Sequence, residues 1–179
     1  MFKPIVKENF FSKEECEWIV GLITRRDIWE PRPEEPWWDK RGIHHPLAHR
    51  HFGNAYIRFL KEKTEEVQRI IKEEYGLEKE VYPDCAALNK WPTGWAQSPH
   101  SDDMKAAGVT GFETRVFGSL IYLNDNFEGG QLYYPKQNFY VTPKPGMLAI
   151  HPGDEEHLHG VTEITSGTRY TISSLVWGI

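Results

Sequence analysis

The N-terminal part of the chain carries the pattern of a short capped helix. Ser12 is followed three residues later by Glu15, a capping box in which hydroxyl and carboxylate close the first helical turn. Apolar residues then recur at helical spacing, at Trp18, Ile19, Leu22 and Ile23. The pattern predicts a helix over about residues 13–24.

A longer amphipathic pattern runs from about Ala55 to Tyr75, and Gly76 stands where a C-terminal cap is expected. Its apolar residues fall on one face, with Lys and Glu elsewhere, so this helix should lie against an apolar surface. Those residues are Ile57, Leu60, Val67 and Ile71. Residues 26–50, between the two helices, are rich in Pro, Trp and His without a clear period, and we predict a long, partly ordered loop there.

After residue 80 the helical period gives way to short β-prone runs separated by Gly and Pro. Helices followed by strands predict an α+β, mainly β fold, with helices outside an antiparallel barrel or sandwich. We expect one domain over 1–179, with helical support over about 1–80 and a β core over about 81–179. The predicted strands are 86–91, 115–124, 131–134, 139–142, 147–151 and 169–177.

Composition excludes several classes of protein. The net charge of −5 and the absence of a basic block argue against nucleic acid as a partner. Cys16 and Cys85 lack a CxxC spacing, which disfavours a disulfide scaffold or a structural zinc site. With neither a signal-peptide pattern nor a long apolar run, we expect a soluble, cytoplasmic protein without a membrane partner.

Two histidines and an aspartate carry the candidate chemistry. His100 and Asp102 are two residues apart, so on an extended strand or strand end both can reach one ligand. His159 on a distant strand would complete two imidazoles and one carboxylate, the ligand set of non-haem iron oxygenases. Arg169 offers a planar fork suited to a carboxylate, and Thr171 would add a hydroxyl from the same strand face.

Several short motifs follow one another in order along the chain. They are His100-x-Asp102, Arg115 leading a strand that ends Ile121-Tyr122-Leu123-Asn124, Gly129-Gly130, Pro145-Gly146-Met147, and His159 with Arg169. In this order, from about Val81 to Trp177, the chain resembles the prolyl 4-hydroxylase-like branch of the Fe(II)- and 2-oxoglutarate-dependent oxygenases. The resemblance implies a double-stranded β-helix, or jelly-roll, core with N-terminal flanking helices.

The resemblance also implies a role for each motif position. His100, Asp102 and His159 would be the metal ligands, and Asp102 favours hydroxylation because related halogenases place a small residue there. Arg169 would bind the distal carboxylate of 2-oxoglutarate, and Tyr122 matches a tyrosine that contacts the same cosubstrate. The expected cofactors are Fe(II), 2-oxoglutarate and O2, with ascorbate as an optional addition, and the products include succinate and CO2.

The expected substrate is a prolyl residue in a peptide or protein. Arg115 matches an arginine that approaches the substrate in prolyl hydroxylases, whereas Trp95 either lines the substrate entrance or belongs to the core. Segments 26–52 and 103–114 are the candidates for clamping an extended chain over the site. Two other functions stay open: an oxygenase of a free amino acid or small metabolite, and a non-catalytic metal-binding β-helix module.

The chain departs from the family pattern at three positions, Trp91, Gly118 and Trp177, the last of which follows Arg169 by eight residues where six is more usual. Trp91 stands where the family often has a tyrosine, so one 2-oxoglutarate contact is either lost or supplied elsewhere. Gly118 replaces a common threonine on the strand before Tyr122.

Other polar residues compete with the predicted ligands. His157 shares a strand face with His159 at spacing two, but the spacing to Arg169 favours His159. His151, on an apolar run, is interpreted as a satisfied, partly buried histidine, and Asp103 as a carboxylate that supports the ligands or faces solvent. A cluster of four histidines either binds zinc or nickel or forms a lid rim or solvated surface: His44, His45, His49 and His51.

Overall fold

The computed structural model describes residues 4–25, 27–29, 31, 33–34, 41–83, 86–105, 108, 111 and 114–178, without the side chains of 44–47 and 49. Its helices are α1 (Lys13–Thr24), α2 (His45–Tyr75) and the 3₁₀ turn η2 (Glu155–His157). Its strands are β1 (Ile5–Lys7), β2 (Gly42–His44), β3 (Val81–Pro83), β4 (Ala87–Pro92), β5 (Gln97–His100), β6 (Arg115–Tyr122), β7 (Phe127–Gly129), β8 (Leu132–Tyr134), β9 (Phe139–Val141), β10 (Leu148–Pro152), β11 (His159–Val161) and β12 (Ile164–Gly178).

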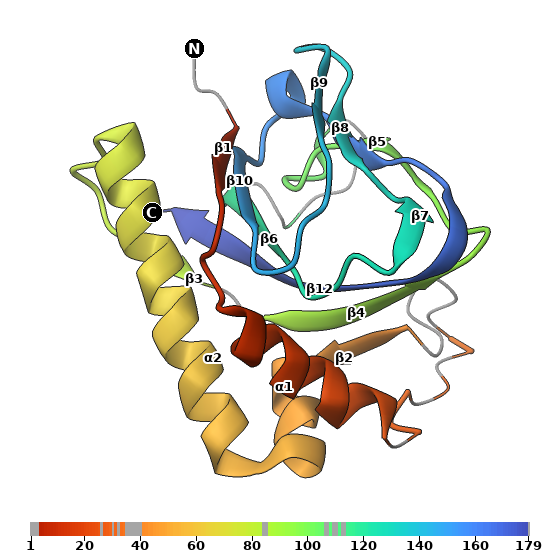
Figure 1. Ribbon diagram of the computed structural model, residues 1–179. Coiled ribbons are helices and arrows are strands. Elements are labelled where there is room, and N and C mark those ends of the chain that lie inside the picture. Colours follow the sequence, from red (N-terminus) through yellow and green to blue (C-terminus); the bar gives the residue numbers. More distant parts are fainter. Residues whose placement is uncertain are drawn as a thin grey trace.

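The strands form two antiparallel sheets. The larger has the order β1-β10-β6-β12-β4-β2, with β3 and β7 also pairing with β12, and the smaller has the order β5-β11-β8-β9. Helices α1 and α2 cover the outer side of the larger sheet, and the smaller sheet lies across from its inner side (Figure 1). This arrangement is a double-stranded β-helix with flanking helices, which confirms the predicted fold class.

Helix α1 begins and ends where its sequence pattern predicts. The Glu15 amide donates to the Ser12 hydroxyl at 3.1 Å, and the Ser12 amide donates to the Glu15 carboxylate at 2.7 Å. This capping box satisfies two amides that the first turn would otherwise leave unpaired. The buried face of the helix carries Cys16, Ile19 and Ile23.

Helix α2 is longer than predicted. The loop expected over 26–50 is wrong in its last part, because β2 pairs there with β4 and α2 already begins at His45. Gly53, at φ 72°, breaks the helix, and beyond it the predicted amphipathic segment buries Leu60, Val67 and Ile71. The helix ends as predicted, since Gly76 takes a φ of 61° and the Leu77 amide donates to the Lys72 carbonyl.

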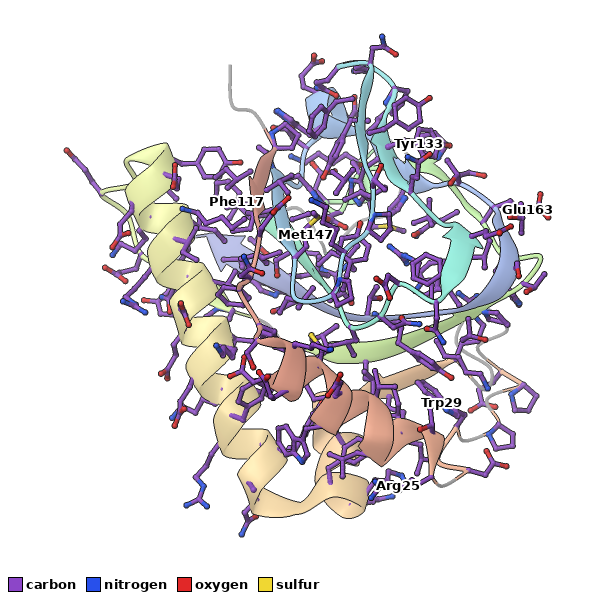
Figure 2. The ribbon with its side chains drawn as sticks, viewed as in Figure 1. Arg25, Trp29, Phe117, Tyr133, Met147 and Glu163 are labelled. Atoms are coloured by element: carbon purple, nitrogen blue, oxygen red, sulfur yellow. The ribbon has the colours of Figure 1, made fainter. Side chains whose placement is uncertain are left out.

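Side chains of the large sheet alternate between its two faces and form an apolar layer on each. Ile121, Leu148 and Ile172 face the helices, as does Phe117, whose ring centre lies 4.8 Å from that of Tyr75 on α2 (Figure 2). Because neighbouring side chains of a strand point to opposite faces, residues of the other parity point between the sheets. There they form an inner cluster of Tyr122, Leu132, Tyr134, Val141, Met147 and Ala149.

In the described part of the chain, no helix is both long and apolar enough to cross a membrane.

Candidate functional site

His100 and His159 are cross-strand partners in the smaller sheet. β5 and β11 run antiparallel with these residues opposite each other, and their ring centres are 4.4 Å apart. Asp102 follows in the turn after β5, and its Oδ1 lies 3.7 Å from Nε2 of His159. One ligand atom from each of the three residues lies within 4.8 Å of the others. The structure thus brings the three predicted metal ligands together.

The hydrogen bonds of both histidines place the ring hydrogen on Nδ1, and Nε2 of His100 also lies 3.2 Å from the Gln97 amide nitrogen. Nδ1 of His100 lies 3.1 Å from the Ser98 carbonyl, and Nδ1 of His159 lies 3.2 Å from the His157 carbonyl. A carbonyl oxygen only accepts, so each Nδ1 carries the hydrogen and each Nε2 of a neutral ring has a lone pair. A backbone contact of this kind commonly orients metal-binding histidines.

The second predicted group lies on the inner face of β12 and β6. Arg169 and Thr171 are fully buried and pair across strands with Trp91 and Tyr122 respectively. Within the described residues, the three guanidinium nitrogens and the hydroxyls of Tyr122 and Thr171 find no hydrogen-bond partner outside this group, in which Arg169 and Tyr122 interact. Burying such groups unpaired is costly, and together they are complementary to a carboxylate.

Residues 86–177 match the family described as the 2OG-Fe(II) oxygenase superfamily. The chain belongs to this family. Fe(II) and 2-oxoglutarate are the metal and cosubstrate that this membership implies, and the chain is an oxygenase of prolyl 4-hydroxylase-like fold.

Prolyl hydroxylases are the named relatives. Prolyl 3-hydroxylase 3 of Homo sapiens is 34% identical over 64 residues, which are 33% of this chain and 9% of that protein, and its Mus musculus counterpart gives the same figures. The chain therefore spans a small part of these curated relatives.

Two solved structures share the fold over nearly the whole chain. The viral collagen prolyl hydroxylase vCPH from Paramecium Bursaria Chlorella virus-1 has a TM-score of 0.70 and 16% identity, covering 98% of this chain and 96% of its own. A prolyl-4-hydroxylase from Pseudomonas putida has a TM-score of 0.69 and 16% identity, covering 97% and 91%.

The donor groups fit an oxygenase of this family. Two imidazole nitrogens and a carboxylate suit Fe(II) and leave coordination positions for other ligands. Burial raises the pKa of Asp102, but His159 and a hydrogen bond from His151 outweigh it, and the pKa lies well below its ordinary range. Burial, together with nearby His151, lowers the pKa of His159 to about 3. At neutral pH the carboxylate is ionised and the His159 imidazole neutral, the states that a metal requires.

Aromatic rings and guanidinium groups alternate in a series that runs from Tyr122 through Arg169, Trp91 and Arg41 to Trp95. The guanidinium carbon of Arg169 lies 5.1 Å from the Tyr122 ring centre and 5.3 Å from that of Trp91. Arg41 continues the series, at 4.6 Å from Trp91 and 3.6 Å from Trp95. Such contacts favour a cation over a ring face, and burial lowers the pKa of Arg41 only to about 10. Sequence reasoning missed Arg41 because it stands in an aperiodic segment, far along the chain from both rings.

A second residue missed in its role is His151. The expectation that it is satisfied holds, and it is buried rather than partly buried, with 4% exposed. Its partners are unexpected, because Nε2 lies 3.1 Å from Asp102 Oδ2 and Nδ1 lies 2.9 Å from the Tyr134 hydroxyl. No local signal in the sequence indicates these contacts.

The structure corrects the interpretation of His157 and decides between the two offered for Asp103. His157 is in the turn η2 with Nδ1 2.7 Å from Asp154 Oδ1, so the expectation that it shares a strand face with His159 is wrong. Asp103 is 4% exposed and accepts from the Lys105 amide at 3.1 Å, so it closes the turn after the metal triplet and does not face solvent. The side chains of His44, His45 and His49 lie outside the described residues, and the predicted histidine cluster stays a prediction.

The predicted substrate residues lie at different ends of the site. Arg115 opens β6, with its guanidinium carbon 5.7 Å from the Trp177 ring centre. Trp95 packs against a small cluster that contains Trp91 and Ile164. Much of the clamp predicted over 103–114, and of the one over 26–52, lies outside the described residues.

Proposed function

We propose that this chain holds Fe(II) through Nε2 of His100, a carboxylate oxygen of Asp102 and Nε2 of His159. The clustering of the three ligand atoms within 4.8 Å supports this assignment. The hydrogen-bond directions support it further, because both imidazoles keep Nε2 unprotonated, and a metal at His100 would replace the Gln97 contact at that nitrogen.

The distal carboxylate of 2-oxoglutarate is assigned to Arg169, with the hydroxyls of Tyr122 and Thr171 beside it. The observation that carries this step is the fully buried guanidinium, which has no hydrogen-bond partner beyond Tyr122 among the described residues. The rings of Trp91 and Tyr122, on the two strands beside β12, hold the guanidinium in place before any ligand arrives, which reduces the entropy lost on binding. A non-catalytic metal module would leave this buried group without a role.

The proposed reaction is hydroxylation of a prolyl residue in a peptide or protein, with 2-oxoglutarate converted to succinate and CO2. Bound iron and 2-oxoglutarate supply the oxidising chemistry, while the chain orients the cosubstrate and excludes water. The names of the relatives support a prolyl substrate.

Arg115 is the proposed substrate contact. A Cβ built at Gly153 would lie 2.7 Å from the Arg115 carbonyl and 3.3 Å from Asp102 Cβ, so the head of β6 adjoins the proposed metal ligand. A guanidinium on this residue can donate to the carbonyl of a peptide that passes the head of β6.

The first test is iron-dependent release of succinate from 2-oxoglutarate. We expect turnover in the wild type and its loss in Asp102→Ala and Arg169→Ala. The matched controls, exposed Asp125→Ala and Arg25→Ala, should keep it. The absence of both succinate release and 2-oxoglutarate-dependent absorption of the iron complex would overturn the assignment.

The second test identifies the substrate class. Proline-containing peptides and a panel of free amino acids and small metabolites are incubated with the iron-loaded enzyme, and products are screened for the mass of one added oxygen atom. Oxygen on a peptide prolyl residue supports the proposal. Oxygen only on a free metabolite replaces it with the small-molecule alternative.

A further inference from the structure

His151 lies beside the proposed metal ligands with both of its ring nitrogens hydrogen-bonded. It belongs to β10 on the inner face of the large sheet, and both it and Tyr134 are buried. Nε2 lies 3.1 Å from Asp102 Oδ2, and Nδ1 lies 2.9 Å from the Tyr134 hydroxyl. The three side chains form a continuous line from β8 through β10 to the turn after β5.

The direction of each hydrogen bond follows from the chemistry of the partners. An ionised carboxylate only accepts, so Nε2 of His151 carries a hydrogen and donates it to Asp102. Nδ1 then either accepts from the Tyr134 hydroxyl or is itself protonated. In both cases neither nitrogen has a free lone pair, and His151 is therefore not a fourth metal ligand.

The two carboxylate oxygens of Asp102 have different neighbours. Oδ2 is engaged by His151, while Oδ1 lies 3.7 Å from Nε2 of His159, toward the proposed ligand atoms. A carboxylate held at one oxygen cannot rotate freely about its terminal bond. Its other oxygen then stays directed at one point.

Gly118 provides the space for this contact. It is the cross-strand partner of His151 in the pairing of β6 with β10. A Cβ at position 118 would overlap Oδ2 of Asp102 and lie 2.5 Å from Nε2 of His151. Any side chain at 118 would therefore displace one or both partners of the hydrogen bond.

We propose that His151 is a positioning residue for Asp102 and that Tyr134 orients the ring of His151. The arrangement requires glycine at position 118, because a side chain there would displace the hydrogen-bonding groups. The inference rests on the proposed function, because it requires Asp102 to be a metal ligand. Its expected consequence is a metal affinity that depends on an N–H donor at position 151.

Mn(II) binding to the metal-free protein, followed by electron paramagnetic resonance, tests the role without requiring turnover. His151→Leu removes the donor at similar volume, and we expect the dissociation constant for Mn(II) to rise about 10- to 100-fold. His151→Gln keeps an N–H group at a comparable reach and should remain within a few-fold of the wild type. Tyr134→Phe should give a smaller loss than His151→Leu.

Two further variants separate this role from general damage. Gly118→Ala should weaken Mn(II) binding although it leaves His151 in place, because the added methyl displaces Oδ2 of Asp102. Tyr140→Leu, at an exposed side chain on β9, is the control and should not change the dissociation constant. Gly118→Ala also tests the arrangement if His151→Leu does not fold.

The outcomes separate failure of the proposed metal site from failure of the positioning role of His151. Equal Mn(II) binding by the wild type and Asp102→Ala would overturn the proposed metal site itself. Loss in Asp102→Ala with wild-type affinity in His151→Leu or in Gly118→Ala would overturn the positioning role alone. Equal weakening by His151→Leu and His151→Gln would also overturn it, because the retained donor would then have no effect.

Discussion

The guanidinium carbon of Arg169 lies 5.1 Å from the centre of the Tyr122 ring, and in the described part of the chain neither side chain has a hydrogen-bond partner other than the other. Both are completely buried. A buried cation without a counter-ion among the described residues lowers stability, and a carboxylate ligand would supply that counter-ion. Substitutions here should therefore change stability and binding in opposite directions.

Arg169→Met should weaken 2-oxoglutarate binding by about 100-fold, because a charge-assisted forked contact is lost. The same change should raise the free energy of unfolding of the ligand-free protein by about 1–4 kcal/mol. Tryptophan fluorescence can follow binding to the Mn(II) form, since Trp91 lies beside the guanidinium, and urea unfolding measures stability. The control is exposed Arg25→Met (Figure 2), and a marked loss of stability in Arg169→Met would identify a structural arginine instead.

Tyr122→Phe removes a single hydroxyl from the same group. We expect the dissociation constant for 2-oxoglutarate to rise about 10-fold, the cost of one hydrogen bond to a charged group. Stability of the ligand-free protein should fall little, because Arg169 is the one group of the described residues that the hydroxyl contacts. Tyr140→Phe, at a side chain 53% exposed, is the matched control, and unchanged affinity in Tyr122→Phe would remove Tyr122 from the cosubstrate site.

Arg115→Ala tests the substrate side of the site. We expect KM for a proline-containing peptide to rise about 10-fold or more, as for loss of a hydrogen bond from a charged donor. Mn(II) and 2-oxoglutarate affinities should stay at wild-type values, because Arg115 belongs to neither proposed group. A parallel loss of Mn(II) affinity would show that the residue supports the turn at Asp102 rather than the substrate.

Cys16 predicts a pH dependence of stability. It is 1% exposed, its thiol lies 3.8 Å from the Tyr122 carbonyl, and burial raises its pKa to about 11. Above the unfolded-state pKa of about 8.5 the unfolded chain loses this proton while the folded chain keeps it. Stability from this group is thus complete below about pH 8.5 and falls as the pH rises toward 11.

Urea unfolding between pH 8 and pH 10 measures this effect. The wild type should lose more stability over the interval than Cys16→Ala, which lacks the titrating thiol. Equal pH slopes in the two proteins would contradict the assignment. Iodoacetamide should also modify Cys16 slowly in the folded protein at pH 8, because the reactive thiolate is scarce and enclosed.

Local signals were enough for much of the fold. Ser12 and Glu15 predict the start of α1 because a capping box acts within one turn, and Gly76 ends α2 for a similar reason. The predicted runs from 86 to 177 overlap six strands. The short strands β1, β2, β3, β5, β7 and β11 lie outside those runs, and only the ligand argument for His100 and His159 indicated strands at β5 and β11. Strands this short depend on pairing with their neighbours more than on a pattern of their own.

The sequence by itself determined the candidate donors of the site and their parity. His100 and Asp102 share a ligand, and Arg169 and Thr171 share a face, because spacing along an extended chain is a covalent property. Only the tertiary structure decided that His100 faces His159, that Trp91 and Tyr122 enclose Arg169, and that Gly118 leaves room for His151 to reach Asp102. These relationships join residues far apart in the chain, so they depend on strand register and packing, which no local pattern encodes.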